Sequence, residues 1–118
     1  MAYIDGFLTP VPVDKKDAYK TFAEKWVPIL KDLGALSTTE CWGDDVPDGE
    51  VTSFPMAVKQ KEGETVVFSW TVWPDKATRD AGWAKMMEDP RMKELDMSKA
   101  PFDGKRLMFG GFEVLVEN

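Results

Sequence analysis

The stretch that decides the fold is TVVFSWTVWPDKATRDAGWAKMM, residues 65–87. Its first part, Thr65–Trp73, is dense in β-branched and aromatic side chains, which favour a strand. Asp75 then begins a helix as its N-cap. We expect the packing stripe of this helix to consist of Ala77, Ala81, Ala84 and Met86 or Met87. The segment therefore predicts a strand followed at once by a helix.

The same order occurs at the N-terminus. A strand is expected over Ala2–Leu8, ended by prolines that cannot donate a ladder hydrogen bond. A helix follows, with Asp14 as its N-cap, apolar side chains at helical spacing and a stop at Gly34. Pro28 interrupts this helix, and we expect a kink before it.

Each half then adds one more strand, Ala35–Gly43 in the first and Arg106–Val116 in the second. The resulting order βαββαβ predicts an α+β domain over residues 1–118, with a four-stranded antiparallel sheet and two helices on one face. The other face then needs a second chain to cover it, which predicts a homodimer. The Gly110-Gly111 pair indicates a bulge or a close backbone approach in the last strand.

Composition excludes several classes of function. The 118 residues carry a net charge of −6, which opposes nucleic-acid binding. No apolar run is long enough to span a membrane. The chain has one cysteine, Cys41, and no histidine, so the usual base at neutral pH and the commonest zinc ligand are absent. We expect a cytoplasmic protein without disulfides.

No motif in the sequence indicates a cofactor or a metal. The acidic residues of the long connection Gly43–Glu64 do not match a calcium-binding loop, and prolines make a turn-rich loop a sufficient explanation. These acidic residues are Asp44, Asp45, Asp48 and Glu50. The glycines of 104–111 lack the GxGxxG spacing of a dinucleotide site. We therefore expect neither a cofactor nor a metal, and we consider Gly43–Glu64 as a lid over a cavity.

Five stretches that span nearly the whole chain resemble the YbaA-like family of small bacterial proteins of unknown function. They are MAYIDGF (1–7), GDDVPDGEVTSFP (43–55), VVFSW (66–70), DPRM (89–92) and PFDGKRLMFGGFEVL (101–115). The resemblance implies a ferredoxin-like fold of the dimeric α+β barrel kind. That superfamily also contains cofactor-free monooxygenases and other enzymes acting on small ligands.

Strand parity separates the two sheet faces, because successive side chains in a strand point to opposite sides. The even-numbered positions are apolar and are assigned to the helix-covered face: Ile4, Leu8, Val66, Phe68, Trp70, Val72, Met108, Phe112 and Val114. The odd-numbered positions mix apolar and polar types, which suits a dimer interior with a polar-lined cavity.

The candidate site lies on this odd-numbered face. Asp5 and Glu113 are the candidates for proton handling, because a carboxylate on a half-buried face is either paired or functionally perturbed. The alternative for both is a salt bridge or hydrogen bond at the interface, with Arg106 or Arg91 of either chain as the partner. The candidate ligand-binding residues are Tyr3, Phe7, Ser69, Trp73 and Phe109.

The sequence leaves three functions open. The first is a homodimer that binds a small apolar or aromatic metabolite in a cavity. The second is a cofactor-independent enzyme of monooxygenase-like or isomerase-like type, and the third is a structural or interaction dimer without a ligand. In the third case the same aromatic side chains only fill space.

Overall fold

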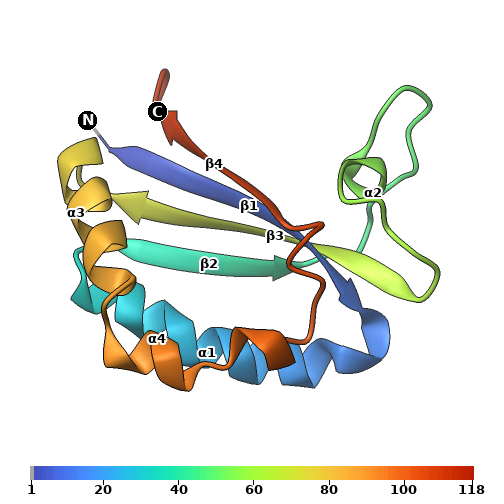
Figure 1. Ribbon diagram of the computed structural model, residues 1–118. Helices are drawn as coiled ribbons and strands as arrows, with labels where there is room; N and C mark the ends of the chain where they lie inside the picture. The colour runs from blue at the N-terminus through green and yellow to red at the C-terminus, as the bar shows by residue number, and fades with distance from the viewer. Residues whose placement is uncertain (1) are drawn as a thin grey trace.

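The computed structural model describes residues 2–118 as one four-stranded sheet with helices packed on one side (Figure 1). The strands lie in the order β2-β3-β1-β4, and each neighbouring pair is antiparallel. The strands are β1 (Tyr3–Pro12), β2 (Ser37–Trp42), β3 (Glu64–Trp73) and β4 (Met108–Glu113). The main helices are α1 (Lys16–Asp32) and α3 (Lys76–Met86), with short helices α2 (Phe54–Ala57) and α4 (Pro90–Glu94) and 3-10 turns η1 (Val13–Lys15) and η2 (Met97–Lys99). The predicted α+β architecture and βαββαβ order are confirmed.

β1 continues through the prolines at which it was expected to end. It pairs with β3 along its whole length, as far as Pro12 opposite Glu64. Its pairing with β4 stops at Leu8, so beyond Leu8 one edge of β1 has no strand beside it. Val13 donates its N–H to Gly63 on the β3 side, so the prolines face the free edge, where no ladder donor is needed.

α1 begins differently from the prediction but ends where it was expected. A 3-10 turn precedes it, and Asp14 lies within that turn instead of capping the helix. The helix runs through Pro28 to Asp32, and Gly34 then adopts a φ of +117°. In α3 the predicted cap is confirmed, since the Asp75 carboxylate accepts a hydrogen bond from the N–H of Thr78 at 2.7 Å.

α3 packs through a different stripe from the one predicted. Its alanines are exposed, whereas Gly82 and Met86 are buried. A Cβ at Gly82 would lie 2.7 Å from the Trp73 ring, so glycine lets the helix approach the sheet closely. The face of α3 turned to the sheet also carries Arg79 and Trp83, which reach Asp5.

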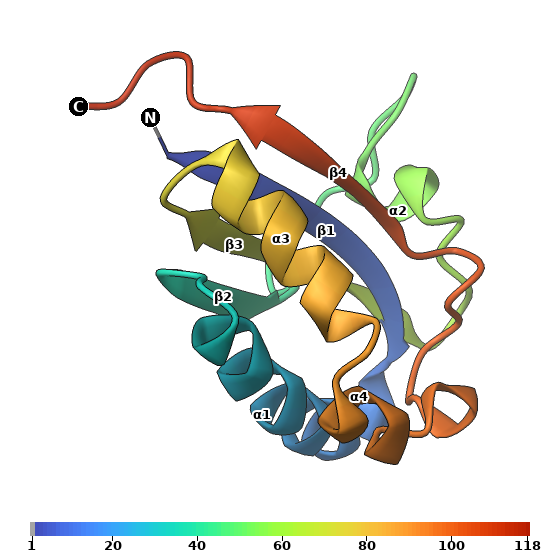
Figure 2. The ribbon, with the colours of Figure 1, turned by 60° about the vertical axis from the view of Figure 1, so that its left-hand side comes forward.

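The assignment of the two sheet faces was wrong. The helices lie on one side of the sheet (Figure 2). This side is the odd-numbered face, on which Val67 and Trp73 have no exposed surface. The even-numbered face is open, and Phe68 and Phe112 there are 45% and 60% exposed. Polar side chains such as Asp5 remain on the covered face because they are hydrogen-bonded beneath the helices.

β4 contains no bulge. Its register against β1 is regular from Leu8 opposite Met108 to Tyr3 opposite Glu113. The close approach expected at the glycine pair is present, because a Cβ on Gly111 would collide with the ring of Tyr3. Because no bulge shifts the alternation, Glu113 lies on the same sheet face as the other odd-numbered residues of β4.

The long connection 43–63 lies on the open side of the sheet, opposite α1 and α3 (Figures 1 and 2). The Phe54 ring of α2 packs edge-on against Phe68 of β3, with centroids 6.0 Å apart. Val58 is buried in the same segment. Within residues 2–118, no helix combines the length and the apolar character needed to cross a membrane.

Candidate functional site

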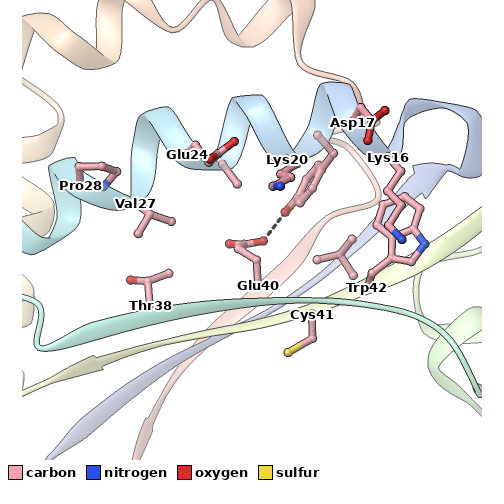
Figure 3. Close-up of a pocket in the computed structure, with 13 residues that line it drawn as sticks. Lys16, Asp17, Lys20, Glu24, Val27, Pro28, Thr38, Glu40, Cys41 and Trp42 are labelled. Carbon is pink, nitrogen blue, oxygen red and sulfur yellow. Dashed lines mark hydrogen bonds between the residues drawn. The ribbon is translucent and has the colours of Figure 1, made fainter.

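Two cavities lie between the sheet and the helices. The outer one is an open groove of about 710 Å³ between α1 and β2 (Figure 3). The inner one is smaller, about 230 Å³, and lies under α1, α3 and the segment 90–107. Their linings share two residues, Tyr19 and Glu40. These two side chains therefore form the partition between the groove and the inner cavity.

The inner cavity is walled mainly by apolar and aromatic side chains. The sheet, α1, α3 and the segment 90–107 each contribute to the walls: Phe7, Phe22, Trp26, Trp83, Met86, Met92, Leu95, Met97, Phe102, Leu107 and Phe109. Its polar contributors are Thr9, Tyr19, Glu40 and Ser69. A small apolar cavity with a few converging polar groups is typical of a small-molecule site.

Glu40 is the one carboxylate in this lining. It lies on β2 opposite Ser69, and its side chain points toward α1 (Figure 3). Tyr19 of α1 donates its hydroxyl to Glu40 Oε1 at 2.5 Å. The other oxygen, Oε2, is buried and has no hydrogen-bond partner within residues 2–118. This oxygen is an acceptor that a ligand donor could satisfy.

Burial shifts the acid–base properties of this pair. Burial raises the pKa of the Glu40 carboxyl, and the hydrogen bond from Tyr19 and the hydroxyl of Ser69 on the neighbouring strand lower it in part. Burial, and next the charge of Glu40, raise the pKa of Tyr19. The tyrosine therefore stays a hydrogen-bond donor throughout the neutral range, and the Glu40 carboxyl releases its proton at a higher pH than an exposed glutamate does.

Asp5 is also buried on the helix-covered face, but its oxygens are fully engaged. Oδ1 accepts from Arg79 Nη2 at 2.8 Å. Oδ2 accepts from the indole N–H groups of Trp73 and Trp83, each at 2.9 Å. The hydrogen bond to Asp5 raises the pKa of Arg79. Asp5 thus fixes Trp83, which is one wall of the inner cavity.

Three aromatic rings stand in series at the β4 side of the inner cavity. Phe109 stacks on Phe7 with centroids 6.2 Å apart and on Trp83 at the same separation, with interplanar angles of 29° and 19°. Trp26 meets Phe7 edge-on at 6.0 Å. Aromatic rings in the lining favour an aromatic or planar apolar ligand.

The structure separates the predicted site residues. Phe7, Ser69 and Phe109 line the inner cavity. Tyr3 and Trp73 belong instead to the core cluster around Leu30, Ala35 and Met86. The two predicted carboxylates are not brought together: Asp5 pairs with Arg79 inside the same chain, not with Arg91 or Arg106.

Glu113 lies exposed at the end of β4. The cavity that we expected on the odd-numbered face lies under the chain's own helices. The segment 90–107 covers this cavity, and no residue of 43–64 lines it.

Sequence reasoning missed Glu40 and Tyr19. A signal was present, because Thr38, Glu40 and Trp42 alternate along β2 on the face turned to α1. Cys41, between them, points to the other side of β2 in Figure 3. Within residues 2–118, no group of three or more histidine, cysteine, aspartate or glutamate side chains is arranged to hold a metal ion.

Comparisons with known proteins agree on family and fold. Residues 2–104 match the family described as "Protein of unknown function (DUF1428)". The chain is 57% identical over 117 residues to the uncharacterized protein YbaA of Escherichia coli (strain K12), with 99% of each chain covered, and equally similar to YbaA of Shigella flexneri.

Two solved structures share the fold. A dimeric ferredoxin-like protein from an uncultured marine organism covers the whole chain at a TM-score of 0.57 and 17% identity, with all of that protein covered. Rv0793 from Mycobacterium tuberculosis has a TM-score of 0.53 at 11% identity, with 99% of this chain and 98% of that one covered. The fold is therefore ferredoxin-like.

Proposed function

We propose the following function for this chain, which belongs to the DUF1428 family of proteins of unknown function: it binds a small, planar, largely apolar metabolite in the inner cavity. The observation that carries this proposal is Glu40 Oε2, a buried acceptor without a partner at the wall of an apolar cavity. Leaving a buried polar atom unsatisfied costs about 1–3 kcal/mol. A ligand hydroxyl or N–H would recover part of that cost.

The aromatic walls and the size of the cavity narrow the ligand further. The volume of about 230 Å³ lies below the roughly 300–1,000 Å³ common for ligand pockets, which favours a molecule of one or two rings. Phe109, Phe7 and Trp83 contribute aromatic rings to the lining beside such a molecule. A carboxylate in the lining selects against anionic ligands and for a neutral donor.

The binding proposal is tested with 2-naphthol as the probe, because it combines two fused rings with one hydroxyl. We expect saturable quenching of tryptophan fluorescence and roughly tenfold weaker binding to Glu40→Gln, since a hydrogen bond to a charged acceptor is replaced by one to a neutral amide. Glu24→Gln is the matched control: Glu24 lines only the outer groove, and binding should not change. Equal affinity for wild type and Glu40→Gln would contradict the role of Glu40.

We also propose that the protein is a homodimer through its open sheet face. The even-numbered side chains of three neighbouring strands form a continuous apolar surface there: Ile4, Leu8, Phe68, Trp70, Val72, Met108 and Phe112. An apolar patch of this kind on a single chain marks an interaction surface. A second copy is the favoured partner, because the structural relative described above as dimeric has the same fold.

Sedimentation of the purified protein tests the dimer. Wild type should sediment at twice the chain mass of 13.3 kDa, and Phe68→Glu should sediment as a single chain. Met87→Glu places the same charge on an exposed methionine at the end of α3, on the helix side, and should leave the dimer intact. A monomeric wild type would contradict this proposal.

A further inference from the structure

The partition between the two cavities consists of the Glu40 carboxyl and the Tyr19 hydroxyl that is hydrogen-bonded to it. Tyr19 donates to Glu40 Oε1 at 2.5 Å, and the pair faces the open groove on one side and the apolar cavity on the other. The groove is open to water and carries charged side chains such as Lys16, Asp17 and Lys20 at its rim. The carboxyl group of Glu40 can therefore contact a ligand in the inner cavity while it lies next to the water of the outer groove.

We propose that Glu40 is the catalytic base of a proton-transfer activity on a small, planar, enolisable ketone held in the inner cavity. This inference rests on the proposed binding function and names the substrate class and the reaction at that site.

The reaction balances without any further reactant. The carboxylate of Glu40 takes a proton from the carbon next to the ketone carbonyl, and that C–H bond breaks. Its electron pair forms the C=C bond of the enolate as the carbonyl π pair moves onto oxygen. Glu40 then returns a proton to carbon, and between the two steps the proton can exchange with water in the groove. The net result is exchange of the α-proton of the ketone with water through an enolate.

The surroundings of Glu40 suit this role better than those of the other buried carboxylate. An effective general base needs a pKa close to the working pH, and burial moves the pKa of Glu40 upward, in that direction. Tyr19 holds Oε1 in place and leaves Oε2 free of protein donors. Asp5, by contrast, already accepts hydrogen bonds from Arg79 and two indoles, so it has no oxygen left for a substrate proton.

The experiment uses 2-indanone in D2O, with loss of its α-proton signals followed by ¹H NMR. We expect wild type to exchange these protons about a hundredfold faster than Glu40→Gln, within the range typical of general base catalysis. Glu24→Gln, on the rim of the outer groove, should exchange at the wild-type rate. Thermal unfolding of each variant confirms that it is folded, and Gln keeps the size of Glu without its charge.

Binding of 2-indanone is measured separately by fluorescence quenching, so that the two proposals can fail independently. If 2-indanone binds and its exchange depends on Glu40, the activity is supported. If it binds and exchanges equally fast with Glu40→Gln, the proton-transfer proposal is overturned while the binding function stands. If neither 2-indanone nor 2-naphthol binds, both proposals are overturned.

Discussion

Two regions of the covered sheet face each hold a carboxylate, Asp5 in one and Glu40 in the other. The two regions differ in how many hydrogen-bond donors the protein supplies to that carboxylate. Around Asp5, an arginine and two tryptophans supply donors to both oxygens. Around Glu40, a tyrosine supplies one donor, and the second oxygen stays without a partner in the described chain. A fully hydrogen-bonded buried charge holds structure together, whereas an unmatched acceptor beside a cavity is available for chemistry.

Replacing Asp5 should give the largest effect. Asp5→Asn removes the charge that Arg79 faces and should lower the free energy of unfolding by about 3 kcal/mol, the lower end of the cost of breaking a buried ion pair. The lower end applies because the Arg79 side chain keeps 20% of its surface exposed. Urea unfolding measures the change.

Asp80→Asn is the matched control for Asp5→Asn. Asp80 also contacts Arg79, at 3.1 Å, but lies on the exposed side of α3. Its replacement should change stability little. If both variants lost the same stability, the Asp5 region would not be the structural element that we infer.

Trimming one donor from the Asp5 region should have a smaller effect. Trp83→Phe keeps an aromatic wall in the inner cavity but removes the indole N–H that reaches Asp5 at 2.9 Å. We expect a loss of about 1.5 kcal/mol, the lower end for a hydrogen bond to a charged group, because Arg79 and Trp73 still satisfy the carboxylate. A loss as large as that of Asp5→Asn would show that Trp83 acts through packing instead.

The pH dependence of protein stability tests the environment of Glu40. A carboxyl whose pKa is raised by folding binds more protons in the folded state, so its contribution falls as pH rises. This stability is fully present below the ordinary pKa of 4.5 and is lost as pH rises through the higher folded value.

Glu40→Gln lacks this titration. As pH rises from about 4.5 toward neutrality, the melting temperature of Glu40→Gln should therefore increase relative to that of wild type. Thermal scans across this range measure the difference. A gap between the two proteins that does not vary with pH would contradict the raised pKa.

The sequence was sufficient for the order of the elements. The strand and helix of 65–87 carry strong local signals, and Asp75 caps its helix as its side chain predicts. The length of β1 was not predictable from its own residues, because whether Pro10 and Pro12 are tolerated depends on where β4 stops. That limit is set by a strand nearly 100 residues further along the chain.

The sequence-based assignment of the two sheet faces was wrong for a physical reason. Alternation shows which side chains share a face, but the even-numbered face is apolar whether the chain's own helices or another surface covers it. The odd-numbered face looked half-exposed because Asp5, Ser69 and Thr71 are polar, yet all three are buried. The hydrogen-bonding partners of Asp5 and Thr71 come from distant parts of the chain, Arg79 for Asp5 and Thr38 for Thr71.

The candidate site was predicted only in part for the same reason. Phe7, Ser69 and Phe109 could be placed on the cavity's face by parity alone. Glu40 could not be identified in this way. Its importance depends on the tertiary structure, in which Tyr19 of α1 donates to Oε1 and Oε2 has no partner within residues 2–118.

The most direct test is a ¹³C NMR titration of the glutamate side-chain carboxyls, with Glu40→Gln used to assign the Glu40 signal. We expect one carboxyl signal that titrates above the ordinary range of a glutamate, is absent from Glu40→Gln and shifts when 2-naphthol is added. A Glu40 signal that titrates like that of an exposed glutamate and ignores 2-naphthol would contradict the central claim that this carboxyl is the reactive group of the cavity.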